Sequence, residues 1–261
     1  MLLIDKLSYS SRLRYKSPCI KTLFAVSILL FCILMHSLLF SSFTIVFMGS
    51  LTVIAGRTSL KYYLKLLRLP MAFLILSTIS IIFEISSNPA TVPSLHLMNR
   101  YIYITSEKLY LGAGLVMTAL GGVSCLYFLA LSTPFSDILY VLKVIHCPSL
   151  LIELLLLIYR FIFVLYDMAT ALNTSQESRL VTCNFKTRIK GSVSLFETLF
   201  IRAIRKSSYL YDAMESRCYD GTLKVLNENK KVSKTEILFI IMCEAALIAV
   251  YFIQRSYFKV W

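Results

Sequence analysis

The feature that most constrains this chain is a series of apolar runs, each close to the length that crosses a lipid bilayer. They lie at about 22–40, 42–56, 69–87, 109–131 and 236–254. A transmembrane helix needs about 20 mostly apolar residues, because the lipid core offers no hydrogen-bond partners to an open backbone. Only 16% of the residues are charged, whereas soluble domains average about 25%. The sequence therefore predicts an all-α polytopic membrane protein with about five transmembrane helices.

The basic residues are distributed unevenly between these runs. They crowd before the first run, in the connection 57–68 and in the segment 132–234, whereas the connection 88–108 has only Arg100 and Lys108. Loops rich in Lys and Arg stay on the cytoplasmic side of a membrane. We therefore expect the N-terminus and both basic segments inside and 88–108 outside. The net charge of +13 then reflects topology and not a nucleic-acid partner.

This orientation divides the chain into three expected parts. They are a membrane core with four spans (1–131), cytoplasmic helices (132–234), and a last span with a C-terminal tail (235–261). The apolar run that follows the basic N-terminal stretch is too long for a cleaved signal peptide, so we expect an uncleaved first span. The protein is thus expected in the cell membrane, the inner one where there are two.

A sixth apolar run, 150–168, is long enough to cross but contains Glu153, Arg160 and Asp167. Charges at the centre of a span cost roughly 2.5–3.5 kcal/mol on insertion scales. A crossing here would also put the basic segment that follows on the outer side. Both arguments favour a helix that lies at or under the membrane surface. A re-entrant or tilted crossing is the alternative.

A second cytoplasmic helix is expected from 195 to about 218. Its apolar residues recur at steps of three and four, opposite a basic flank, which is the pattern of an amphipathic helix. Ser194 and Glu197 have the spacing of a capping box, and Gly221 is suited to end the helix.

The tripeptide Glu-Ser-Arg occurs twice, at 177–179 and at 215–217, each time near the end of an expected helix. One interpretation is two solvated C-terminal turns in which arginine complements the helix dipole, a contribution of about 0.3–1 kcal/mol. The other is docking, because a guanidinium group offers a rigid fork of donors to a partner's carboxylate or carbonyl groups. Two such ends would suit two copies of a partner.

The sequence lacks the patterns of enzymes and metal sites. Its three histidines are isolated, and its seven cysteines are scattered without Cys-x-x-Cys spacing. We therefore expect no catalytic, cofactor-binding or metal-binding residues in this chain. An alternative function is a self-contained secondary carrier, which needs ionisable groups near the bilayer midplane. Before residue 132 only Glu84 is a candidate.

Several stretches together resemble a known family. They are "IDKLSYSSRLRYKSPCIK" (4–21), "YFLALSTPFSDILYVLK" (127–143), "PSLLIELLLLIYRFIFVLYD" (148–167), "SQESR" (175–179) and "YDAMESRCYDG" (211–221). The chain is similar over nearly its whole length to the transmembrane T component of energy-coupling factor (ECF) transporters, most closely the cobalt-type CbiQ proteins. The last two stretches resemble the family's two coupling motifs, usually written Ala-Arg-Gly.

The resemblance implies an energy-coupling subunit without catalysis of its own. Its partners would be two ABC-type ATPases, which bind ATP and magnesium, and a substrate-binding membrane S component. The cargo implied is cobalt, with nickel as the alternative. The ATPase-coupling residues carried over are Arg179 and Arg217 with the neighbours Ser178, Leu180, Ser216 and Cys218. Serine replaces the usual alanine twice, and Leu180 and Cys218 stand where glycine is common, which puts the closeness of helix approach at the second motif in doubt.

Overall fold

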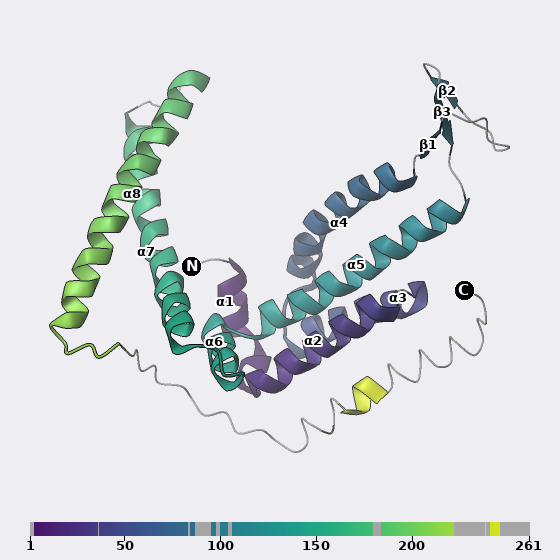
Figure 1. Cartoon of the computed structure of the whole chain (residues 1–261), viewed down its shortest axis with the longest axis horizontal. Coiled ribbons are helices and arrows are strands. Elements are labelled where there is room, and N and C mark those ends of the chain that lie inside the picture. Colours follow the sequence, from purple (N-terminus) through teal and green to yellow (C-terminus); the bar gives the residue numbers. More distant parts are fainter. Residues whose placement is uncertain are drawn as a thin grey trace. The chain divides into compact units, whose positions relative to one another are not determined.

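The computed structural model describes residues 3–35, 37–82, 84–86, 95–97, 100–103, 106–179, 184–221, 238 and 241–245. The chain divides into two compact units, one formed by 2–138 with 229–261 and the other by 139–228 (Figure 1). The first is called the membrane unit below and the second the hairpin unit. The three-part division expected at residues 132 and 234 stays a prediction.

The membrane unit is built from helices, as the sequence predicted. In chain order they are α1 (Leu3–Ser10), the 3₁₀-helix η1 (Arg12–Tyr15), α2 (Pro18–Met35), α3 (Leu38–Ser50) with its π-helical continuation η2 (Leu51–Ala55), α4 (Leu60–Ile82) and α5 (Ser106–Ser132). Four segments are long and apolar enough to cross a membrane: 18–35, 38–55, 60–82 and 108–132. The expected all-α membrane fold is confirmed.

The boundary between the first two spans differs from the predicted one. The run 22–40 was expected to be one helix, but α2 ends at Met35 and α3 begins at Leu38. The Ser37 hydroxyl accepts a hydrogen bond from the Phe40 amide at 3.3 Å, so serine caps the new helix. An N-cap inside an apolar run is easily missed, because the hydropathy hardly changes there.

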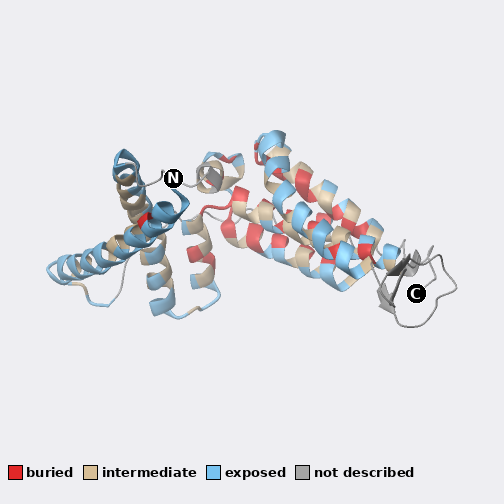
Figure 2. Ribbon diagram, turned by 90° about the horizontal axis from the view of Figure 1, so that it is seen from above, coloured by how far each residue is buried: buried red, intermediate tan, exposed pale blue. Residues whose placement is uncertain are grey.

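Helix α5 lies at the centre of the membrane unit, beside α2, α3 and α4 (Figure 1). Buried side chains of α2, α3 and α5 form a core that includes Ile28, Phe40 and Cys125. Figure 2 shows the buried residues in red. A Cβ atom at Gly121 would lie 2.7 Å from the Cys32 sulfur, so α5 approaches α2 at a distance that only glycine permits.

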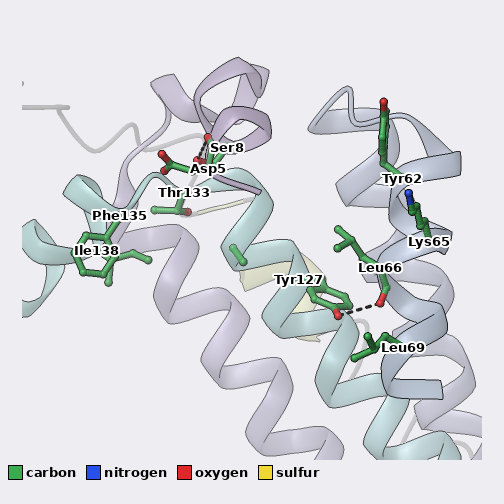
Figure 3. Close-up of a pocket in the computed structure, with 11 residues that line it drawn as sticks. Asp5, Ser8, Tyr62, Lys65, Leu66, Leu69, Tyr127, Thr133, Phe135 and Ile138 are labelled. Atoms are coloured by element: carbon green, nitrogen blue, oxygen red, sulfur yellow. Dashed lines mark hydrogen bonds between the residues drawn. The ribbon is translucent and has the colours of Figure 1, made fainter. Parts of the chain in front are cut away.

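Helix α4 runs through a proline, which corrects the predicted third span at 69–87. Pro70 has no backbone N–H, so the carbonyl of Leu66, four residues earlier, loses its helical partner. The Tyr127 hydroxyl on α5 donates to this carbonyl at 3.1 Å (Figure 3). A neighbouring helix thus satisfies the freed group, which lets α4 begin at Leu60 and continue past the proline.

Three short strands follow α4, in a connection that was expected only to be an outer loop. They are β1 (Glu84–Ser86), β2 (Leu95–Leu97) and β3 (Arg100–Tyr103), and they form an antiparallel sheet in the order β1-β3-β2. Ile102 pairs with Ile85 on one side and with Leu95 on the other. Of the span expected at 236–254, the described residues 241–245 are helical and most of the rest lies outside the described residues.

The hairpin unit consists mainly of two long helices, α7 (Ser149–Ser178) and α8 (Phe185–Glu215), which follow α6 (Phe135–Val144). Pro148 precedes α7 as its N-cap residue. The capping box expected at Ser194 is wrong: that residue lies inside α8, and the box is formed by Asn184 and Thr187. Helix α8 therefore begins ten residues earlier than predicted.

Helix α7 is also long and apolar enough to span a membrane by length and composition. It contains the run 150–168, for which we expected a helix at the membrane surface. The structure leaves that expectation as a prediction, because the length and composition of a helix do not distinguish the two positions.

Candidate functional site

The two Glu-Ser-Arg stretches lie at opposite ends of a helical hairpin. Gln176, near the end of α7, donates a hydrogen bond to the carbonyl of Gly191, near the start of α8. Beyond the end of α8, the Tyr219 hydroxyl donates to Glu153 in the first turns of α7. The two helices therefore run in opposite directions. With a rise of about 1.5 Å per residue, α7 covers about 40 Å between Glu153 and Arg179.

Arg179 ends α7. It is the C-cap residue, its backbone N–H bonds to the carbonyl of Gln176 at 3.1 Å, and its side chain is exposed. Ser178 beside it is exposed too, and its hydroxyl bonds back to the carbonyl of Thr174. Leu180 lies outside the described residues. An arginine at a helix C-terminus interacts favourably with the helix dipole. The exposed Arg179 side chain is also accessible to a partner.

Arg217 lies in the turn that ends α8, and this turn is a Schellman motif. The Tyr219 amide bonds to the carbonyl of Met214 at 3.1 Å, and the Cys218 amide bonds to that of Glu215 at 2.9 Å. Ser216, Arg217 and Cys218 are all exposed. Both arginines thus project from helix ends, as the sequence predicted, and the structure does not bring them together.

Cys218, and not Gly221, is the left-handed residue of the turn that ends α8. Its φ of 58° is left-handed, a conformation that costs a residue with a side chain roughly 1–2 kcal/mol and glycine almost nothing. This explains why glycine is common at this place in the resembled motif. The sequence led us to relate this glycine to close helix packing, but the exposed Cys218 side chain points to backbone conformation as the cause.

Replacing Cys218 with glycine is therefore expected to stabilise the hairpin unit. Relief of the left-handed strain should raise the free energy of unfolding by about 1 kcal/mol. The gain is measured by thermal unfolding of the purified full chain, with Cys218→Ala as the control that keeps a Cβ atom. A Cys218→Gly variant that unfolds at the same temperature as Cys218→Ala contradicts the strain argument.

Tyr219 is a residue that the sequence analysis missed. Its hydroxyl lies 2.9 Å from Glu153. This hydrogen bond, followed by desolvation and then by the charges of Glu153, Asp220 and Tyr211, raises the pKa of the phenol. A phenol whose pKa is raised in the folded state stabilises that state fully at pH values below its ordinary pKa of about 10. This contribution is lost as the pH rises through the shifted pKa. The bond to Glu153 therefore persists across the physiological range.

Lys21 is a second missed residue, because the sequence analysis counted it only among the basic N-terminal residues. Its side chain is 5% exposed. Its ammonium group donates to the carbonyl of Leu13 in η1 and to that of Ser132, the last residue of α5, both at 3.0 Å. A buried cation at the carboxyl end of a long helix is stabilised by these carbonyls and by the helix dipole.

Glu244 is a third missed residue. It belongs to the described part of the expected last span, and its carboxyl group lies 2.6 Å from the hydroxyl of Ser27 on α2. An ionisable residue inside a membrane helix is usually paired in this way. The contact joins the expected last span to α2.

Other features of the described residues are weaker candidates for a site. A cavity of about 700 Å³ beside α1, α4 and α5 has a mostly apolar lining, with Asp5 and Lys65 as its charged residues (Figure 3). In the described part of the chain, no three His, Cys, Asp or Glu side chains gather as metal ligands would.

Comparisons with known proteins find a matching family model and several similar chains. The family model described as CbiQ, cobalt transport protein, matches residues 10–228. An uncharacterised protein of Methanocaldococcus jannaschii is 31% identical over 255 residues, which cover 98% of this chain and 94% of that protein. The cobalt transport protein CbiQ of Salmonella typhimurium is 26% identical over 219 residues, 84% of this chain and 97% of that protein. A putative fused cobalt transport protein, CbiMQ, of Methanocorpusculum labreanum is 29% identical over 234 residues, 88% of this chain and 39% of that protein.

Proposed function

Because this multi-pass membrane protein belongs to the CbiQ family of cobalt transport proteins, we propose that it is the energy-coupling T component of an ECF-type importer. In this function it links ATP hydrolysis by two ABC-type ATPase subunits to uptake of a transition-metal ion, cobalt in the first place. Recognition of the metal belongs to a substrate-binding membrane partner, and ATP and magnesium belong to the ATPases. The chain itself carries no catalytic residue in this account.

The observation that carries the proposal is the pair of exposed arginines at opposite ends of one hairpin. A separation of about 40 Å is too large for one small binding pocket, and it suits two separate docking sites on a dimer of ATPases. Arg179 and Arg217 supply the guanidinium groups, and Ser178, Ser216 and Cys218 are the exposed residues beside them. Leu180 would flank the first contact.

The fused relative supports a membrane partner. The cobalt transport protein of Methanocorpusculum labreanum matches this chain over 39% of its own length. The remainder of that protein leaves room for a second transport component. We propose that a separate substrate-binding subunit, which assembles with the present chain, corresponds to that second component.

The proposal requires the hairpin unit to be cytoplasmic, and this is tested by labelling. A cysteine at the exposed position Lys190, in a background without the native cysteines, should react with a membrane-impermeant reagent only from the cytoplasmic side. A cysteine in the segment 88–108 is the control and should react only from outside. Labelling of position 190 only from outside would show that α7 crosses the membrane, and the coupling function would then be untenable.

A further inference from the structure

At each arginine-bearing end of the hairpin, the described residues include a side-chain hydrogen bond to the opposite helix. At the first end, Gln176 donates to the carbonyl of Gly191 at 3.0 Å, and the carbonyl of Gln176 accepts the backbone N–H of Arg179. At the second end, Tyr219, two residues after Arg217, donates to Glu153 at 2.9 Å. The same arrangement thus recurs at both ends, although the residue types differ.

The packing between these two ties is loose. An open groove of about 400 Å³ runs between α7 and α8, lined by apolar residues that include Leu154, Phe161, Leu210 and Met214. Apolar contact along such a groove does not fix the register of two helices, because dispersion contacts need close surfaces on both sides. The two hydrogen bonds therefore contribute much of the geometric definition of the hairpin.

The tie at the second end also explains Glu153. This carboxylate lies in an otherwise apolar stretch, and it is seven residues from Arg160, too far along the helix for an i, i+4 pair. Glu153 is half-buried, so its hydrogen bond with Tyr219 replaces water that the carboxylate has lost. A hydrogen bond to an ionised acceptor is about twice as strong as a neutral one.

We propose that Tyr219, Glu153 and Gln176 are positioning residues that brace the hairpin, so that its two arginine ends move as one rigid piece. The inference rests on the proposed function and names the residues through which the arginines act. Movement of one ATPase is then passed to the other end of the hairpin and not absorbed by bending between the helices. Removing a brace leaves both arginines available for docking but weakens the mechanical link between them.

The experiment compares variants in the reconstituted full transporter. Tyr219→Phe removes one brace and Gln176→Met the other, and each should lower the metal transported per ATP hydrolysed by about three- to tenfold, the factor expected for one net hydrogen bond. Both ATPases should still co-purify. Glu153→Gln keeps an acceptor oxygen but removes the charge, so its ratio should lie between those of the wild type and Tyr219→Phe. Adding Glu153→Leu to Tyr219→Phe should cause no further loss.

Matched controls are available on the same helices. Tyr209→Phe removes an exposed hydroxyl from α8, and Asn173→Leu removes an amide whose bond stays within α7. Both should leave the ratio of metal to ATP unchanged. If Tyr219→Phe and Gln176→Met behave like these controls, the bracing proposal is wrong while the coupling function stands. If they release the ATPases as strongly as changes at the arginines do, the residues act in docking and the proposal is equally wrong.

A distance measurement tests bracing without any partner. Spin labels on the native Cys218 and on an introduced Ser178→Cys, with the other cysteines replaced, report the separation of the two ends in the full chain by pulsed electron paramagnetic resonance. The wild-type distribution should be narrow and centred on about 40 Å, and either brace variant should broaden it. An unchanged distribution in both variants overturns the proposal, whatever happens to transport.

Discussion

Replacing Arg179 and Arg217 together with glutamate is expected to abolish metal uptake, with a loss of more than about 100-fold. Removal of one partner of a close charged contact costs about 2–5 kcal/mol, and glutamate adds repulsion towards any acidic group in the partner's groove. Each single change should release one ATPase and lower uptake strongly. Uptake of radioactive cobalt into proteoliposomes that contain the whole transporter measures the effect.

The matched control for each single variant is Arg205→Glu, which makes the same charge change as either of them at an exposed position on α8. It should leave uptake within about twofold of the wild type, because surface charges away from a contact contribute little. Normal uptake by the double variant would exclude the coupling function. A loss in Arg205→Glu equal to that of a single variant would show that overall charge, and not the two ends, matters.

Replacing Lys21 with methionine is expected to give the largest loss of stability in the membrane unit. Methionine fills a similar volume but leaves the carbonyls of Leu13 and Ser132 without their charged donor. Hydrogen bonds to charged groups contribute about 1.5–3 kcal/mol each, so a loss of about 3 kcal/mol and a Tm lower by about 10 °C are expected. Thermal unfolding in lipid nanodiscs, followed by size-exclusion chromatography, measures the change.

Lys16→Met is the control for Lys21→Met, because Lys16 lies five residues earlier and is exposed. Its Tm should stay within about 2 °C of the wild type. Equal Tm values for the two variants would contradict the anchoring of α5 by the buried ammonium group. Lys21→Arg, which keeps the charge and the donors, should recover part of the loss.

The predictable part of this fold comes from hydropathy. Apolar runs of about 20 residues predict the first four membrane helices and their order, because a backbone in lipid must form its hydrogen bonds within the segment. The errors lie where a side chain far away in the sequence decides a helix boundary. Helix α4 passes Pro70 because Tyr127 supplies the missing partner to Leu66, and no local pattern announces that contact.

The candidate site was predictable only as far as local sequence motifs identify it. The doubled Glu-Ser-Arg tripeptide identifies two helix ends, and both arginines lie at such ends. The two residues that hydrogen-bond at the second of these ends, Tyr219 and Glu153, are 66 positions apart, and they meet only when the hairpin folds. We took Cys218 for a packing residue because the sequence around it does not reveal its left-handed backbone conformation.

The central claim is that each end of the hairpin docks one ATPase, and counting the bound subunits tests it most directly. Native mass spectrometry of the complex released from membranes should find two ATPase subunits per chain in the wild type, one in Arg179→Glu, one in Arg217→Glu and none in the double variant. Two ATPase subunits bound to the double variant would contradict the claim.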